Sequence, residues 1–188
     1  MAQNDVTYSY LIPIGDLSLG ERQASRAGCD TVLKANATRL AIRDRLDDMI
    51  IRDVLPNVDL GLAATDDWLV AGPGVAGTDL QYIGAAIPND RVIAFWGCGM
   101  ESAIPSISRL RLTLGAASSQ VRGAFQLEQL YSRLEPVGYF SESIAFIRGE
   151  FCRVMVLPRL AFAANGQRFH LLARTIEPIG TTVSAPSV

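Results

Sequence analysis

Apolar and polar residues alternate along most of the chain after residue 60, and this period of two is typical of half-buried β-strands. In the clearest segment, 109–114, every second residue is leucine and the residues between are Arg, Arg and Thr. Strands of this kind bury one face and leave the other in water, as in antiparallel sheets. Eight strands are predicted, at residues 67–71, 79–83, 91–97, 105–114, 121–131, 143–148, 151–157 and 167–176.

A long helix is predicted before these strands. Residues 30–56 are rich in Ala, Leu, Arg and Asp, Asp30 is a suitable N-cap, and a proline ends the segment. The apolar residues lie on two sides of this helix, because Ile42 and Met49 drift away from the first apolar side. A helix that is apolar on two sides is expected to pack against two partners, the body of its own subunit and a neighbouring subunit. A kink near Arg43 is the alternative explanation of the same pattern.

The first 29 residues are predicted to form an extended arm. Tyr8, Tyr10 and Ile12 alternate with other residues, and a polar stretch with three glycines follows. A segment with so little core of its own is either flexible or held against another surface. Residues 181–188 have the composition of a loose tail.

Eight short strands behind one helix are most simply arranged as a mainly β protein, an antiparallel β-sandwich or jelly roll. The dipeptide Asn165-Gly166 favours a hairpin between the last two strands, because a type I′ turn needs two positive φ angles. Glu-Pro turns at 135–138 and 177–180 direct the chain out of a sheet. The predicted organisation is an arm at 1–29, a helix at 30–56, a β-sandwich body at 57–180 and a tail at 181–188.

Composition narrows the class of protein. The 188 residues are 49% hydrophobic and carry a formal net charge of −2, which favours a globular domain with a substantial core over a disordered chain. A charge so near zero produces no field that would attract nucleic acid or an anionic membrane. No apolar run approaches the roughly 20 residues of a membrane span, and the first residues lack the basic start of a secretory signal. We therefore expect synthesis in the cytoplasm, no direct nucleic-acid partner and no membrane partner.

No catalytic, cofactor-binding or metal-binding residue is predicted. Residues 72–77 match the G-x-G-x-x-G spacing of dinucleotide-binding loops, but no βαβ alternation follows, so a surface loop is expected. His170 is the only histidine and is expected on a sheet face or at an interface. The acidic pairs at 47–48 and 66–67 suit a helix surface and a turn. Three widely spaced cysteines indicate ordinary thiols, with one disulfide or an interchain bond as the alternative; they are Cys29, Cys98 and Cys152.

Several apolar side chains are predicted to form contact surfaces. Trp96 and Met100 follow a strand in a glycine-flanked loop, and Tyr139 with Phe140 occupies a second such loop. Exposed aromatic and Met side chains at loop tips are typical of interfaces; the alternative is that both tips fold back over the ends of the sandwich. The interface candidates from the arm, the helix and the loops are Tyr8, Tyr10, Ile12, Ile42, Met49, Trp96, Met100, Tyr139 and Phe140.

The arm, the sandwich strands around 109–131, the Glu-Pro turns and the Asn165-Gly166 hairpin together resemble the small structural proteins of tailed-bacteriophage virions. This class includes capsid decoration proteins and neck or tail accessory subunits. The resemblance lies in the order and type of these elements along the whole chain, not in a sequence motif. It implies a non-enzymatic subunit that is made in the host cytoplasm and located in the virion. Such a subunit forms a homo-oligomer and docks to other virion proteins, such as a major capsid or neck protein.

Two other functions stay open at the level of sequence. The first is a jelly-roll module that binds a carbohydrate or another ligand in a loop-lined cleft, with residues such as Trp68, Trp96 and Tyr139. The second is an enzyme that places two carboxylates in one pocket. The position of the acidic side chains in the fold separates these alternatives.

Overall fold

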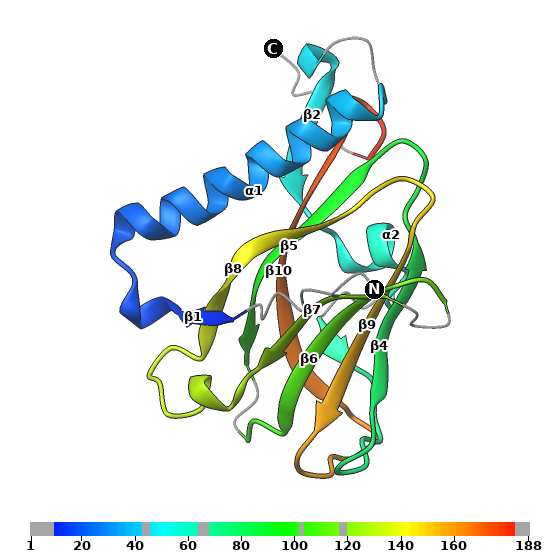
Figure 1. The fold of residues 1–188 in the computed structure, drawn as a ribbon. Coiled ribbons are helices and arrows are strands. Elements are labelled where there is room, and N and C mark those ends of the chain that lie inside the picture. The colour runs from blue at the N-terminus through cyan, green and yellow to red at the C-terminus, as the bar shows by residue number, and fades with distance from the viewer. Residues whose placement is uncertain (1–9, 43–45, 64–67, 102–103, 117–119, 183–188) are drawn as a thin grey trace, which may run out of the picture.

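Two antiparallel β-sheets pack face to face, and a long helix covers the outer side of one of them (Figure 1). This architecture comes from a computed structural model that describes residues 10–42, 46–63, 68–101, 104–116 and 120–182. The larger sheet has the order β1-β8-β5-β10-β2, with β3 also paired to β10, and the smaller sheet has the order β4-β9-β6-β7. The strands are β1 (Leu11–Pro13), β2 (Met49–Asp53), β3 (Leu69–Val70), β4 (Leu80–Ala86), β5 (Val92–Met100), β6 (Ile107–Leu114), β7 (Gln120–Gln126), β8 (Val137–Phe146), β9 (Phe151–Pro158) and β10 (Gln167–Pro178).

The strand pairing is nested along the chain. Strand β3 pairs with β10, β4 with β9, β5 with β8, and β6 with β7. The first and third of these pairs belong to the larger sheet and the other two to the smaller sheet. A long hairpin folded over in this way has the strand order of a jelly roll. The predicted antiparallel β-sandwich is therefore confirmed, with β1 and β2 added at the two edges of the larger sheet.

The main core lies between the two sheets. Leu110 and Leu112 of β6 point into it, while Arg109 and Arg111 face outward and pair with Asp79, as the period-two pattern predicts. The rings of Phe125 and Phe140 stack across the core with centroids 3.9 Å apart. The largest fully buried side chains are the phenylalanines Phe95, Phe125, Phe146 and Phe169.

Helix α1 (Leu19–Arg39) lies across the outer face of the larger sheet, over β8, β5 and β10 (Figure 1). It begins with a capping box, in which the Ser18 hydroxyl accepts from the Glu21 amide and the Glu21 carboxylate accepts from the Ser18 amide. Its inner side and the sheet bury a second apolar cluster, made of Cys29, Leu33, Ala37, Val92, Ala94 and Ile176.

The predicted boundaries of the helix are wrong. The segment predicted as one helix, 30–56, contains the second half of α1, a turn and the strand β2. Asp30 is not the N-cap but lies inside the helix, where its carboxylate pairs with Arg174. The chain leaves the helical path at Ala41, which has a positive φ of 45°. Ile42 therefore lies in the turn after α1 and Met49 begins β2, which explains why one helical stripe did not fit them. Residues 43–45, with the proposed kink at Arg43, lie outside the described residues.

The predicted arm is also wrong over its described part. Residues 11–13 form β1, which pairs with β8 of the same chain, and Arg133 binds Asp16 through two hydrogen bonds of 2.9 Å. Residues 19–29 belong to α1. The segment therefore covers its own sandwich rather than extending to a neighbour. The rest of the described secondary structure is the helix α2 (Pro56–Leu60) and the short 3-10 turns Ile14–Asp16, Leu46–Asp48 and Glu128–Leu130.

Asn165-Gly166 forms a turn but not the predicted hairpin. Strands β9 and β10, on either side of it, lie in different sheets, so the loop crosses from one sheet to the other. Gly166 has a positive φ of 74°, and a Cβ there would collide with the carbonyl oxygen of Val70. The dipeptide thus predicts a change of direction correctly, but it does not identify the strand that follows as a partner.

Candidate functional site

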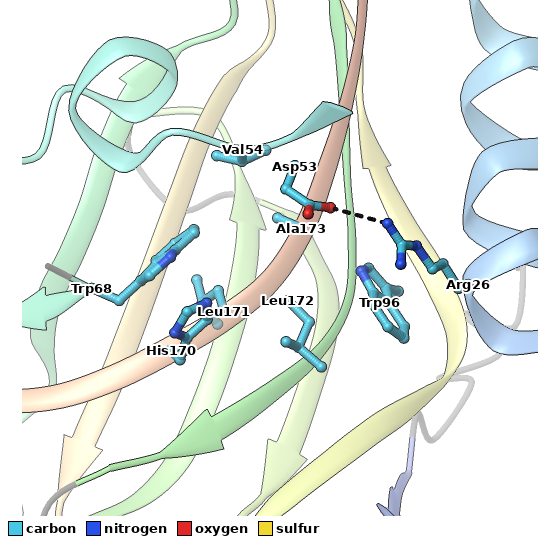
Figure 2. Close-up of a pocket in the computed structure, with 9 residues that line it drawn as sticks. All are labelled: Arg26, Asp53, Val54, Trp68, Trp96, His170, Leu171, Leu172 and Ala173. Carbon is cyan, nitrogen blue, oxygen red and sulfur yellow. Dashed lines mark ion pairs between the residues drawn. The ribbon is translucent and has the colours of Figure 1, made fainter. Parts of the chain in front are cut away.

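A pocket of about 170 Å³ lies on the outer face of the larger sheet, beside helix α1. Figure 2 shows Trp68 and His170 on one side of it, Trp96 on the other, and Leu172 between them. Trp68 comes directly before β3, Trp96 from β5, and His170 and Leu172 from β10. Trp96 and His170 occupy outward positions of neighbouring strands, whereas Trp68 packs partly against the main core and also reaches the cavity.

The aromatic walls of the pocket are supported by other rings. The Trp68 and His170 rings lie with centroids 5.3 Å apart and planes tilted by 33°, and Trp96 packs on Tyr139 at 4.8 Å. Tyr139 is buried, and burial raises the pKa of its hydroxyl. This packing holds the indole rings in fixed orientations and leaves part of each accessible.

The rim of the pocket carries paired charges. Arg26 of α1 reaches Asp53 of β2 at 3.9 Å, and the Nε of Arg174 lies 3.3 Å from the same carboxylate. His170 Nδ1 lies 3.3 Å from a carboxylate oxygen of Glu101. The rim therefore offers hydrogen-bond donors and acceptors together, with little excess of either charge.

Sequence reasoning located part of this site. The alternative of a jelly-roll binding module names Trp68, Trp96 and Tyr139 as ligand contacts. The structure places both tryptophans at the pocket and Tyr139 against Trp96, outside the lining. His170 lies on the outer face of the sheet, one of the two positions expected for it. Arg26 and Asp53 were missed, because they belong to segments that were predicted as an arm and as a helix. The outward position of Asp53 at the end of β2 is recognisable only when the strand boundary is known.

A second cavity of about 440 Å³ lies between α1 and β8. Trp96 lines this cavity as well as the first. The helix contributes small side chains here, which leave the space open between helix and strand. The other lining residues are Ala24, Ser25, Gly28, Val32, Phe140, Ser141, Glu142 and Ser143.

The interface candidates lie in three different environments. Met100, Tyr139 and Phe140 are buried in their own chain. The predicted loop tips are wrong, because Trp96 and Met100 belong to strand β5 and Tyr139 and Phe140 to strand β8. Ile42 and Met49 pack against the cluster between α1 and the sheet. Trp96 and Ile12 are half-buried, and Tyr10 is largely exposed. Tyr8 lies outside the described residues.

Two carboxylates converge at another place, in a buried ionic network that joins β2, α2 and β10. Arg52 donates to both oxygens of Glu177 at 2.9 Å and to both oxygens of Asp59 at 2.7 and 2.9 Å. Arg91 lies 2.6 Å from Asp59 and 3.1 Å from Glu177. We refer to these four residues as the buried charge network.

The electrostatics of the buried charge network favour a structural role. Burial by itself raises the pKa of Asp59, but hydrogen bonds from Arg52, the Leu55 amide and Arg91 hold it below its usual value. The side chains of Asp59 and Glu177 are fully inaccessible to solvent. A pair of catalytic carboxylates needs a cleft that admits substrate, and this pair is enclosed and neutralised by two arginines.

The remaining candidate chemistry is sparse in the described part of the chain. Residues 72–77 form a loop between β3 and β4, as predicted. The three cysteines are buried and unpaired, and burial raises their thiol pKa values, that of Cys29 to about 12. Among the described residues there is no group of three or more His, Cys, Asp or Glu placed to hold a metal ion. Within the same residues, no helix has the length and hydropathy to span a bilayer.

Comparison with protein families, with curated proteins and with solved structures finds no match for this chain.

Proposed function

We propose that this protein is a non-enzymatic structural subunit of a virion, of the capsid-decoration or accessory kind, that associates with itself and with neighbouring virion proteins. The observation that carries the proposal is the nested pairing of eight strands into a single jelly roll. This architecture recurs in viral capsid domains. Edge strands β1 and β2 extend the larger sheet of this body, and helix α1 packs on its outer face. None of them adds a second domain.

One end of the sandwich presents a surface suited to association. Val75, Ile104 and Leu160 are 62%, 68% and 46% exposed and lie in loops between strands. Backbone hydrogen bonds link these loops, from Gly77 to Pro158 and from Leu160 to Ser106. We call Val75, Ile104 and Leu160 the end-loop patch. Apolar side chains that gather on adjoining loops are candidates for a protein contact.

The end-loop patch replaces the arm as the source of contacts in this proposal. The described part of the predicted arm is packed on its own subunit and offers no reach to a neighbour. In this proposal the subunit binds its neighbours through the loops at one end of its sandwich. Side-chain changes in these loops leave the strand pairing intact.

The oligomeric state tests the proposal. Native mass spectrometry and light scattering over micromolar to near-millimolar concentration are expected to show a homo-oligomer. The triple variant Val75→Ser, Ile104→Ser and Leu160→Ser is expected to shift the population to monomer with an unchanged circular dichroism spectrum.

A matched control is Val121→Ser. Val121 is 55% exposed on the edge strand β7, outside the end-loop patch, so this variant is expected to keep the wild-type mass distribution. A wild-type protein that stays monomeric at every concentration would overturn the proposal, as would an oligomer unaffected by the triple variant.

A further inference from the structure

We propose that the pocket lined by Trp68, Trp96 and His170 binds one ring of an uncharged saccharide. This inference goes beyond the structural role proposed above and does not depend on it, because the pocket and the end-loop patch share no residue. Three features of the pocket point to this class of ligand: its walls, its size and its charge.

The walls are flat and already ordered. Trp68 with His170 forms one wall, and Trp96, supported by Tyr139, forms the other (Figure 2). A sugar ring presents a face of C–H groups, which packs on the electron-rich face of an indole ring. Since both indoles are held by neighbouring rings, little side-chain freedom is lost when a ligand binds.

The size of the pocket limits the ligand to one small ring. Its volume of about 170 Å³ lies below the roughly 300–1,000 Å³ of pockets that enclose drug-sized molecules. Asp53 at the rim is 74% exposed, so the pocket is open to solvent on that side. A chain of further sugar units therefore has room to continue away from the protein.

The charges around the pocket favour a ligand that is polar but uncharged. Arg26 faces Asp53 within the lining of the pocket. Outside the lining, Arg174 pairs with both Asp53 and Asp30, and Glu101 lies beside His170. With carboxylates beside the arginines, the rim lacks the concentrated positive charge that recognises phosphate or sulfate. Guanidinium donors and carboxylate acceptors side by side suit hydroxyl groups, each of which both donates and accepts a hydrogen bond.

The two tryptophans make the test direct. They are the only tryptophans in the 188 residues, so the intrinsic fluorescence of the chain reports on this pocket. A glycan array with neutral, sialylated and sulfated glycans identifies the preferred terminal sugar, and that sugar is then titrated into the full chain while fluorescence is recorded. We expect a neutral glycan among the strongest signals and a saturable change of fluorescence.

Two variants probe the two parts of the site. Trp68→Ala removes one wall and is expected to weaken binding of the sugar about tenfold, because the large contact area of the indole ring is lost. Asp53→Asn keeps the shape of an exposed side chain and removes one acceptor charge, and a weakening of about threefold is expected. Asp79→Asn is the matched control, because Asp79 is also paired with arginine but lies away from the pocket.

Thermal unfolding of each variant shows whether it is folded before its affinity is compared. If Trp68→Ala is unfolded, Trp68→Phe replaces it, with a smaller expected loss. The proposal is overturned if no neutral glycan on the array binds, if only charged glycans bind, or if a sugar binds equally well to the wild type and to folded variants of both Trp68 and Asp53.

Discussion

Asp59→Asn is expected to remove about 3 kcal/mol from the free energy of unfolding. Its carboxylate accepts hydrogen bonds from Arg52, from Arg91 and from the Leu55 amide, the last at 2.7 Å. The side chain is fully buried, and removing one partner of a buried ion pair costs about 3–5 kcal/mol because the other charge stays behind.

The remaining contacts place the loss at the lower end of that range. In the variant, Arg52 keeps both hydrogen bonds to Glu177, and Arg91 keeps Asp90 at 3.0 Å. Two arginines then face Glu177, which is buried, and Asp90, which is partly exposed. The excess positive charge is therefore offset in part, but Arg91 loses its shortest contact, the 2.6 Å one to Asp59.

Asp79→Asn makes the same chemical change at a solvent-accessible site. Asp79 also pairs with two arginines, Arg109 at 3.1 Å and Arg111 at 2.8 Å, but all three side chains are about one-third exposed. Surface pairs of this kind contribute about 0–1 kcal/mol. The comparison therefore isolates burial as the cause of the larger loss.

Urea unfolding followed by circular dichroism measures both variants. We expect the urea midpoint of Asp59→Asn to fall much further than that of Asp79→Asn, at a similar dependence on urea concentration. Equal and small losses in the two variants would refute the reasoning, because they would show that the buried charge network adds no more than a surface pair.

The dependence of stability on pH gives an independent measurement of the buried charge network. The pKa of Asp59 in the folded protein lies below its ordinary value of 3.8. Its contribution to stability is therefore complete above that ordinary value and is lost as the pH falls through the lower, folded-state value. We expect the urea midpoint of the wild type to fall on acidification through this window, and that of Asp59→Asn to depend less on pH.

Three further predictions concern the local structure. Ser18→Ala removes the cap of α1 and is expected to cost about 1 kcal/mol in urea unfolding, whereas Ser25→Ala, within the same helix, removes only a hydrogen bond to the Glu21 carbonyl and changes stability little. Gly166→Ala is expected to destabilise more than Gly77→Ala, because both glycines have a positive φ but only the first Cβ would collide with a backbone atom, the carbonyl oxygen of Val70; thermal unfolding ranks the two. The three buried thiols are expected to react with a disulfide reagent only in denaturant, because burial raises their pKa values; fast labelling of the native protein would contradict their placement.

Local sequence signals predicted the sandwich because strands that face water on one side carry an alternating pattern. In β6 the alternation of leucine with arginine corresponds to one buried and one accessible face, and this segment is found where it was expected. The Asn165-Gly166 signal was correct as a turn, since Gly166 has a positive φ. The Glu-Pro signals were less reliable, because residues 137–138 of the first belong to β8 and residues 177–178 of the second to β10. Neither signal contains information about which distant strand becomes the partner, and the Asn165-Gly166 hairpin failed for that reason.

The helix was misplaced because two periodic segments follow each other without a clear break. Ser18, with Glu21 three residues later, is the stronger start signal and was overlooked in favour of Asp30. At the other end, Met49–Asp53 contains apolar residues that a helix or a strand can equally accommodate. Pairing with β10 decides between them, and this contact with residues 174–178 is not visible in the local sequence.

The position of α1 explains where many of the apolar residues of this chain are buried. Strand β5 is buried along nearly its whole length, because the core covers its inner face and α1 covers much of its outer face. Apolar residues predicted as contacts between subunits, such as Ile42 and Met49, pack in this second layer within one chain. In the proposed function, the end-loop patch therefore takes the place of these residues as the contact between subunits. At the border of the helix, Trp96 packs against the second layer and also lines the pocket. The pocket thus exists because α1 covers only part of the sheet, and the two proposals concern separate surfaces that can be tested independently.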